Sequence, residues 1–282
     1  MLHKVLQYQS ASGAFPSYVQ AGTEMIPDEN CFITALVLLE LLKFSGTNND
    51  CPLLENAIEK GIEFLQQCEV PGTEGQFNFY PYNTNTPKLN IYLEPDLDDS
   101  ALALLVLLQA GKKSLPQVRS IIEQLFEPRR IKYLTGVDSR WVKRNIFRTW
   151  INEHNRDNPA DCCVNLNILS LYTTVFPGHT LTPHIVTTVK NAIGMFGLST
   201  SGMRRIAPYY AHPAELFFCV ERAIMAGVAD IEMLLHHLKK QVFDNNLPLW
   251  LSAAGTPVCC DAHGRPFWYA PVLWQARNLH SF

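Results

Sequence analysis

Three carboxylates are crowded at the start of an apolar segment. Asp96, Asp98 and Asp99, here called the acidic cluster, fall within four consecutive positions, and residues 102–108 that follow are all apolar. Carboxylates this close at a low-dielectric boundary cannot all ionise cheaply, so we expect at least one to keep its proton. A protonated carboxylic acid beside an apolar cavity is a Brønsted acid aimed at an apolar substrate.

A structural explanation competes with this chemistry. Asp and Ser are favoured N-cap residues, and the helix dipole stabilises carboxylates in the first turn of a helix. Capping accounts for one or two of the three acids and leaves at least one unexplained. We therefore expect the segment to begin a helix and also to hold a carboxyl group with another role.

The same segment carries a resemblance to a known family. Residues 96–101, Asp-Leu-Asp-Asp-Ser-Ala, resemble the D-x-D-D-[T/S]-A motif of class II terpene cyclases, the squalene–hopene and copalyl-diphosphate type. The resemblance implies that Asp98 is the acid that protonates an alkene or epoxide and starts a carbocation cascade. It implies that Asp96 and Asp99 hold the orientation and protonation state of that acid. Ser100 stands where Thr is commoner in the family.

The rest of the chain predicts helices joined by loops that contain Pro and Gly. Apolar residues recur at helical spacing, and few segments alternate as strands do. The expected helices cover residues 31–42, 53–68, 99–110, 115–126, 163–172, 183–192, 214–226, 230–241 and 271–279. This pattern predicts an all-α fold.

A coarse internal repeat indicates how these helices are arranged. Residues 34–39 match residues 100–105, 66 positions later, and a third apolar helix opens after Asp161 at about the same distance. A repeated helix pair with a near-uniformly apolar inner helix predicts stacked helical hairpins that close into a ring. This is the (α/α) barrel, or toroid, of the terpene cyclase and prenyltransferase β-subunit superfamily. We expect residues 1–282 to form a single domain of this kind.

Polar and aromatic residues are expected at the same end of the barrel as the acidic cluster. Segments 147–151, 161–167 and 209–217 resemble segments of small bacterial proteins in this superfamily, and each places polar groups just before an inner helix. Aromatic faces stabilise cations by ~0.5–2 kcal/mol each. The expected substrate-binding residues are Trp150, Tyr209, Tyr210, Phe77, Trp268, Arg148, Asn165 and His212.

Asp161 and Glu215 are expected to line the same pocket mouth. For these polar residues the alternative is N-capping and hydrogen bonding to loop backbone, and for Arg148 it is a structural ion pair.

Two other functional classes remain open. Residues 259–263, Cys-Cys-Asp-Ala-His, contain metal-ligand types, and protein prenyltransferase β-subunits bind zinc through Asp, Cys and His. Adjacent cysteines cannot easily both face one tetrahedral ion, so we assign no metal ligands. A zinc-dependent, prenyltransferase-like enzyme is one alternative, and a non-catalytic isoprenoid-binding or scaffold module is the other.

Composition narrows the choice of partners. The net charge of −3 gives no electrostatic reason to expect nucleic acid. No apolar stretch reaches the ~18 residues of a transmembrane helix, and no signal peptide is recognisable. We therefore expect a cytoplasmic protein whose eight cysteines are reduced.

The sequence thus predicts an isomerase- or lyase-type terpene cyclase of isoprenoid biosynthesis or secondary metabolism. The expected reaction is proton-initiated cyclisation or isomerisation of a hydrophobic isoprenoid or a prenylated small molecule. No cofactor is required, and Mg²⁺ would matter only if the substrate carries a diphosphate. Class II cyclases generally enclose their substrate between two α-barrels, so a homo-oligomer or a partner subunit is a further expectation for a chain of 282 residues.

Overall fold

The computed structural model describes residues 1–45, 51–82, 93–136, 138–152, 158–210, 212–243, 255–261 and 265–280. Within these ranges the chain is mostly helical and carries one small antiparallel sheet. The helices are α1 (Leu2–Leu6), α2 (Cys31–Ser45), α3 (Pro52–Cys68), α4 (Leu97–Gln109), α5 (Leu115–Ile121), α6 (Cys162–Val175), α7 (Leu181–Phe196), α8 (Thr200–Ile206), α9 (Pro213–Met225), α10 (Glu232–Val242) and α12 (Pro271–Arg277). No helix in these ranges is both long and apolar enough to cross a membrane.

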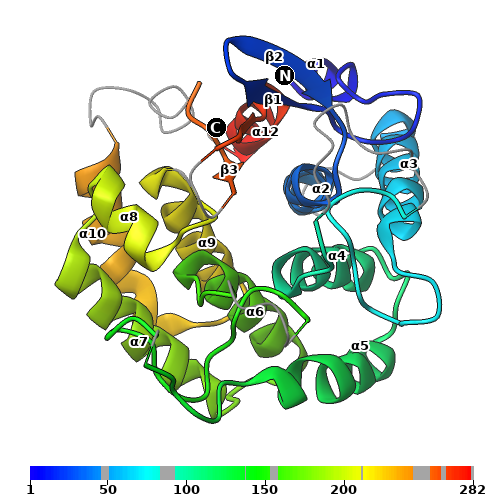
Figure 1. The fold of residues 1–282 in the computed structure, drawn as a ribbon. Helices are drawn as coiled ribbons and strands as arrows, with labels where there is room; N and C mark the ends of the chain where they lie inside the picture. Colours follow the sequence, from blue (N-terminus) through cyan, green and yellow to red (C-terminus); the bar gives the residue numbers. More distant parts are fainter. Residues whose placement is uncertain are drawn as a thin grey trace.

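The helices form an inner and an outer layer. In Figure 1, α2, α4, α6, α9 and α12 follow one another around the middle of the molecule, with α3, α5, α7 and α10 outside them. Each of α2, α4 and α6 packs against the next inner helix, and α12 packs against α2. The inner helices are buried on nearly every side, which explains their uniform apolarity. The predicted helix pairs are confirmed, while closure of the inner layer into a barrel stays a prediction.

The predicted repeat has a hydrogen-bond counterpart. The fourth residue of each of α2, α4 and α6 accepts the backbone N–H of a phenylalanine in the preceding loop. The pairs are Phe15 N to Thr34 Oγ1 (3.2 Å), Phe77 N to Ser100 Oγ (3.0 Å) and Phe147 N to Asn165 Oδ1 (2.9 Å). All three acceptors are buried. The repeat therefore anchors three loops against the N-terminal ends of three inner helices.

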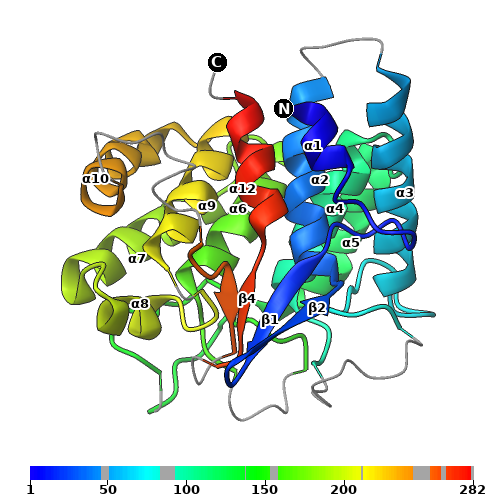
Figure 2. The same ribbon diagram turned by 90° about the horizontal axis from the view of Figure 1, so that it is seen from above.

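The all-α prediction was wrong about one element, a four-stranded antiparallel sheet. Its strands are β1 (Ser17–Ala21), β2 (Glu24–Asp28), β3 (Cys259–Cys260) and β4 (Phe267–Tyr269), in the order β2-β1-β4-β3. The strands are short, and β1 pairs with β4 from the far end of the chain, with Val19 opposite Trp268. Local pattern cannot reveal such a pairing. Figure 2 shows the sheet at the end of the molecule where α2 and α12 begin.

Candidate active site

A pocket lies where the N-terminal ends of the inner helices meet the sheet. Its volume is about 280 Å³, just below the ~300–1,000 Å³ usual for small-molecule sites. Most of its lining residues are apolar or aromatic, and four are aspartates. The lining residues are Phe32, Phe79, Leu93, Asp96, Asp98, Asp99, Thr149, Trp150, Val164, Tyr209, Tyr210, Cys259, Cys260, Asp261 and Trp268.

Asp96 is the N-cap of α4. Its Oδ1 accepts the backbone N–H of Asp98 (2.8 Å) and of Asp99 (2.7 Å), as the capping alternative predicted. Burial raises the pKa of Asp96 well above its usual value, and the charge of Asp98 adds to the rise. The first acid of the cluster therefore has a structural role.

Asp98 is held from both sides. Tyr210 Oη donates to Asp98 Oδ2 (2.5 Å), and Asn167 Nδ2 donates to Asp98 Oδ1 (2.8 Å). Asn167 Nδ2 also donates to Tyr210 Oη (2.9 Å), which leaves the tyrosine proton directed at the carboxyl group. Arg222 Nη1 donates to Asn167 Oδ1 (2.5 Å). Since a guanidinium can only donate, this contact fixes which end of the amide faces Asp98.

The surroundings of Asp98 shift its pKa in two opposite directions. Burial raises the pKa of Asp98, so the group holds a proton more readily than a solvated carboxyl does. The hydrogen bonds from Tyr210 and Asn167, and the charge of Arg222, lower the pKa in part by stabilising the carboxylate. The arrangement suits a group that keeps a proton at rest and remains stable after losing it.

Asp99 differs from both of its neighbours. It is 1% exposed and lines the pocket, and neither carboxyl oxygen has a hydrogen-bond partner within the described residues. Burial raises its pKa well above the usual value, and the charge of Asp96 reinforces the rise. Capping, which explains Asp96, does not explain Asp99.

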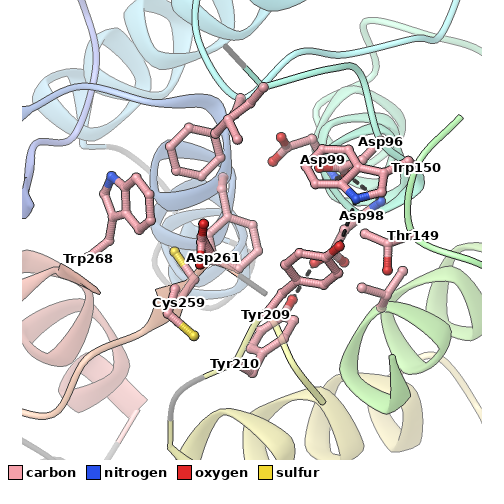
Figure 3. Close-up of a pocket in the computed structure, with 15 residues that line it drawn as sticks. Asp96, Asp98, Asp99, Thr149, Trp150, Tyr209, Tyr210, Cys259, Asp261 and Trp268 are labelled. Carbon is pink, nitrogen blue, oxygen red and sulfur yellow. Dashed lines mark hydrogen bonds between the residues drawn. The ribbon is translucent and has the colours of Figure 1, made fainter. Parts of the chain in front are cut away.

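Four of the expected substrate-binding residues line the pocket: Trp150, Tyr209, Tyr210 and Trp268. Figure 3 shows Trp150 beside the acidic cluster and Trp268 on the opposite side, with the two tyrosines between them. Trp150 Nε1 donates to Tyr209 Oη (2.7 Å), and the two rings meet edge to face. Trp268 Nε1 donates to Asp28 Oδ2 (3.1 Å) on β2. These bonds fix the positions of the rings in the pocket wall.

The other four expected binding residues lie outside the lining. Phe77 is fully buried and forms an isolated antiparallel β-bridge with Asp96. Arg148 forms an ion pair with Asp138 (2.7 Å). Asn165 holds the loop of Phe147, and His212 caps α9 by accepting the N–H of Ala214 (3.2 Å). A polar residue just before or just inside an inner helix points to nearby backbone groups, so its position alone did not predict a pocket contact.

Asp161 and Glu215 also have structural partners instead of positions in the lining. Asp161 caps α6, accepts the backbone N–H of Tyr209 (3.1 Å), and has its pKa raised by burial to about 8. Both oxygens of Glu215 accept from the guanidinium of Arg277, each at 2.7 Å, in a buried pair. This pair joins α9 to α12.

Several residues of the site were not predicted. Phe32, Phe79, Thr149 and Val164 line the pocket, and Asn167 and Arg222 support Asp98 from behind. The signal for the last two was present in the sequence: an amide in the middle of an apolar helix, and a single cation on a helix whose inner face is apolar. Buried polar groups in such positions need partners.

The segment considered for zinc is only partly described. Cys259, Cys260 and Asp261 line the pocket, and Ala262 and His263 lie outside the described residues. In the described part of the chain, no three His, Cys, Asp or Glu side chains are grouped so as to hold a metal ion. Burial raises the pKa of the Cys259 thiol, and it raises that of Cys260 to about 12, so both favour the protonated form.

No protein-family model and no curated protein matches the chain. Among solved structures, the chain is similar over its full length to the apo form of the type II terpene cyclase MstE from Scytonema. The TM-score is 0.49 and the identity 9%, with 100% of this chain and 96% of that chain covered.

Proposed function

We propose that this chain is a class II-type terpene cyclase, a single (α/α)-barrel enzyme that cyclises or isomerises an isoprenoid or a prenylated small molecule. The observation that carries the proposal is the environment of Asp98. Its carboxyl group is buried at an aromatic-lined pocket and is backed by Tyr210, Asn167 and Arg222, which are placed to stabilise its conjugate base. Each hydrogen bond to a charged group contributes about 1.5–3 kcal/mol.

The proposed reaction begins with proton transfer from Asp98. The O–H bond breaks and a C–H bond forms from the π electrons of a substrate alkene, leaving a carbocation and the Asp98 carboxylate. A second alkene attacks the cation to form a C–C bond in cyclisation. Loss of a proton to a basic group or to water then restores an alkene. The product is an isomer of the substrate, and the steps consume no oxidant or reductant.

In this reaction the aromatic residues of the lining stabilise the carbocation. Phe32, Phe79, Trp150, Tyr209 and Trp268 line one pocket, and each favourable cation–π contact is worth about 0.5–2 kcal/mol. A non-catalytic module would be supported by a filled centre and by three acids engaged in caps. The described residues instead enclose a pocket, and of the acidic cluster it is Asp96 that caps the helix.

The proposal is tested by incubating the purified protein with linear isoprenols, their diphosphates and prenylated aromatics, with products read by mass spectrometry. We expect an isomer of one compound, with unchanged mass and shifted retention, from the wild type. Asp98→Asn should yield none while keeping its helical circular dichroism. Asp230→Asn, which changes an exposed carboxyl group outside the pocket lining, should behave as the wild type. Full activity of Asp98→Asn, or no isomer from any compound, would refute the proposal.

A further inference from the structure

The substrate's polar group can be inferred from the partners that the acidic cluster has and lacks. Asp96 accepts two backbone N–H groups, and Asp98 accepts from Tyr210 and Asn167. Asp99, which is 1% exposed, has neither oxygen satisfied within the described residues. A buried polar group is costly to leave without a hydrogen bond. Because Asp99 lines the pocket, a ligand that donates a hydrogen bond there would remove this cost.

The charge of the lining restricts that ligand further. The described lining contains four aspartates, Asp96, Asp98, Asp99 and Asp261, and no Lys, Arg or His. Arg222 and Arg148 lie outside the lining and donate to Asn167 and Asp138. An anionic head group would therefore meet carboxyl groups in a low-dielectric pocket, with no cation of the described lining to receive it.

We propose that Asp99 binds a hydroxyl or amino group of the substrate, which makes the preferred substrate a neutral or cationic isoprenoid and not a diphosphate. Asp98 and Asp99 are adjacent at the start of α4 and line the same pocket. A head group held by Asp99 therefore lies at the same wall as the proposed acid. The volume of about 280 Å³ favours a compact ligand. The isoprenoid part of this assignment rests on the proposed function, whereas the head-group preference rests on the pocket.

The test is a set of binding measurements by calorimetry that does not depend on turnover. Linear prenyl compounds of one chain length are compared as the alcohol, the primary amine, the methyl ether and the diphosphate. The protein carries Asp98→Asn so that no product forms. We expect the alcohol to bind about 10-fold or more tightly than the ether, which lacks the donor, and the diphosphate to bind more weakly than the alcohol. Asp99→Ala added to this protein should remove the difference between alcohol and ether.

Asp99→Asn distinguishes the two head groups. The amide keeps an acceptor for a hydroxyl but, unlike the carboxyl group, cannot ionise to pair with an ammonium group, so the amine should lose about 10-fold in affinity and the alcohol much less. A loss for the amine no larger than that for the alcohol would contradict a charged contact between Asp99 and an ammonium group, and would limit the inferred head group to the hydroxyl.

The outcomes separate this inference from the proposed function. In Asp98→Asn protein that keeps its helical circular dichroism, equal binding of alcohol and ether, tightest binding of the diphosphate, or no binding of alcohol or amine would overturn the inference. If the alcohol binds as expected but the wild type converts none of the compounds, the proposed function fails and the head-group site stands. If the wild type converts the ether and the diphosphate as readily as the alcohol, the function stands and the inference fails.

Discussion

Replacing Ser100 by Ala tests how the acidic segment is held in place. The Ser100 hydroxyl is fully buried, accepts the Phe77 N–H (3.0 Å) and donates to the Asp96 carbonyl (2.6 Å). Ser100→Ala leaves the Phe77 N–H without its acceptor, at about 1–3 kcal/mol, and the lost bond to Asp96 adds about 0.5–1.5 kcal/mol. The higher helix propensity of Ala returns about 0.5 kcal/mol. We expect the free energy of unfolding to fall by about 1–4 kcal/mol.

The measurement is equilibrium unfolding in urea, followed by circular dichroism, at equal m-values. Ser170→Ala is the matched control, since Ser170 is also fully buried on an inner helix. Its hydroxyl donates to the carbonyl of Leu166 (2.9 Å), which also serves the helix backbone, so this variant should lose less than about 1 kcal/mol. Equal losses in the two variants would refute the role of the loop contact.

Three further predictions concern the network, the ion pair and pH. Tyr210→Phe removes a donor to Asp98 and should lower kcat by about 10–100-fold with little change in KM. The control variant Tyr209→Phe should change kcat less than about threefold. Both values are measured by steady-state kinetics on a substrate that the wild type converts. Arg277→Met leaves Glu215 buried and unpaired and should cost about 3–5 kcal/mol of unfolding free energy in urea, part of which Glu215→Gln should restore. Burial raises the pKa values of the acidic cluster above the unfolded value of ~3.9. Above pH ~4 the native state therefore binds more protons than the unfolded state, and the free energy of unfolding should fall as the pH rises toward neutrality. Asp99→Asn should make the free energy of unfolding depend less on pH. A wild-type free energy of unfolding that rises between pH ~4 and neutrality would contradict the prediction.

The sequence predicted the helical pairs and the position of the acidic segment well, because both depend on local pattern. Apolar periodicity identified the inner helices, and the repeat placed the starts of α2, α4 and α6 at nearly equal intervals. The same local evidence predicted that one or two of the three acids cap the helix but placed its start at residue 99, whereas α4 begins at Leu97 with Asp96 as its N-cap. The sheet escaped prediction because β1 and β4 pair across most of the chain.

Side-chain direction was the part that the sequence could not supply. Arg148 and His212 lie near inner helices as expected, but they form an ion pair and a helix cap outside the pocket lining. Asn167 on α6 and Arg222 on α9 support Asp98, and their convergence depends on how those helices pack. A lone amide or cation in an apolar helix was the available signal, and the partner of each depends on tertiary structure.

The most direct test of the proposed chemistry is the isotope content of the product formed in D₂O. If Asp98, exchanged with solvent, starts the reaction by adding its proton to an alkene, the isomeric product must carry deuterium at the carbon that was protonated, and Asp98→Asn must form no such product. A product made in D₂O without deuterium would contradict proton initiation, because the carbon skeleton would then have rearranged without taking a proton from the enzyme.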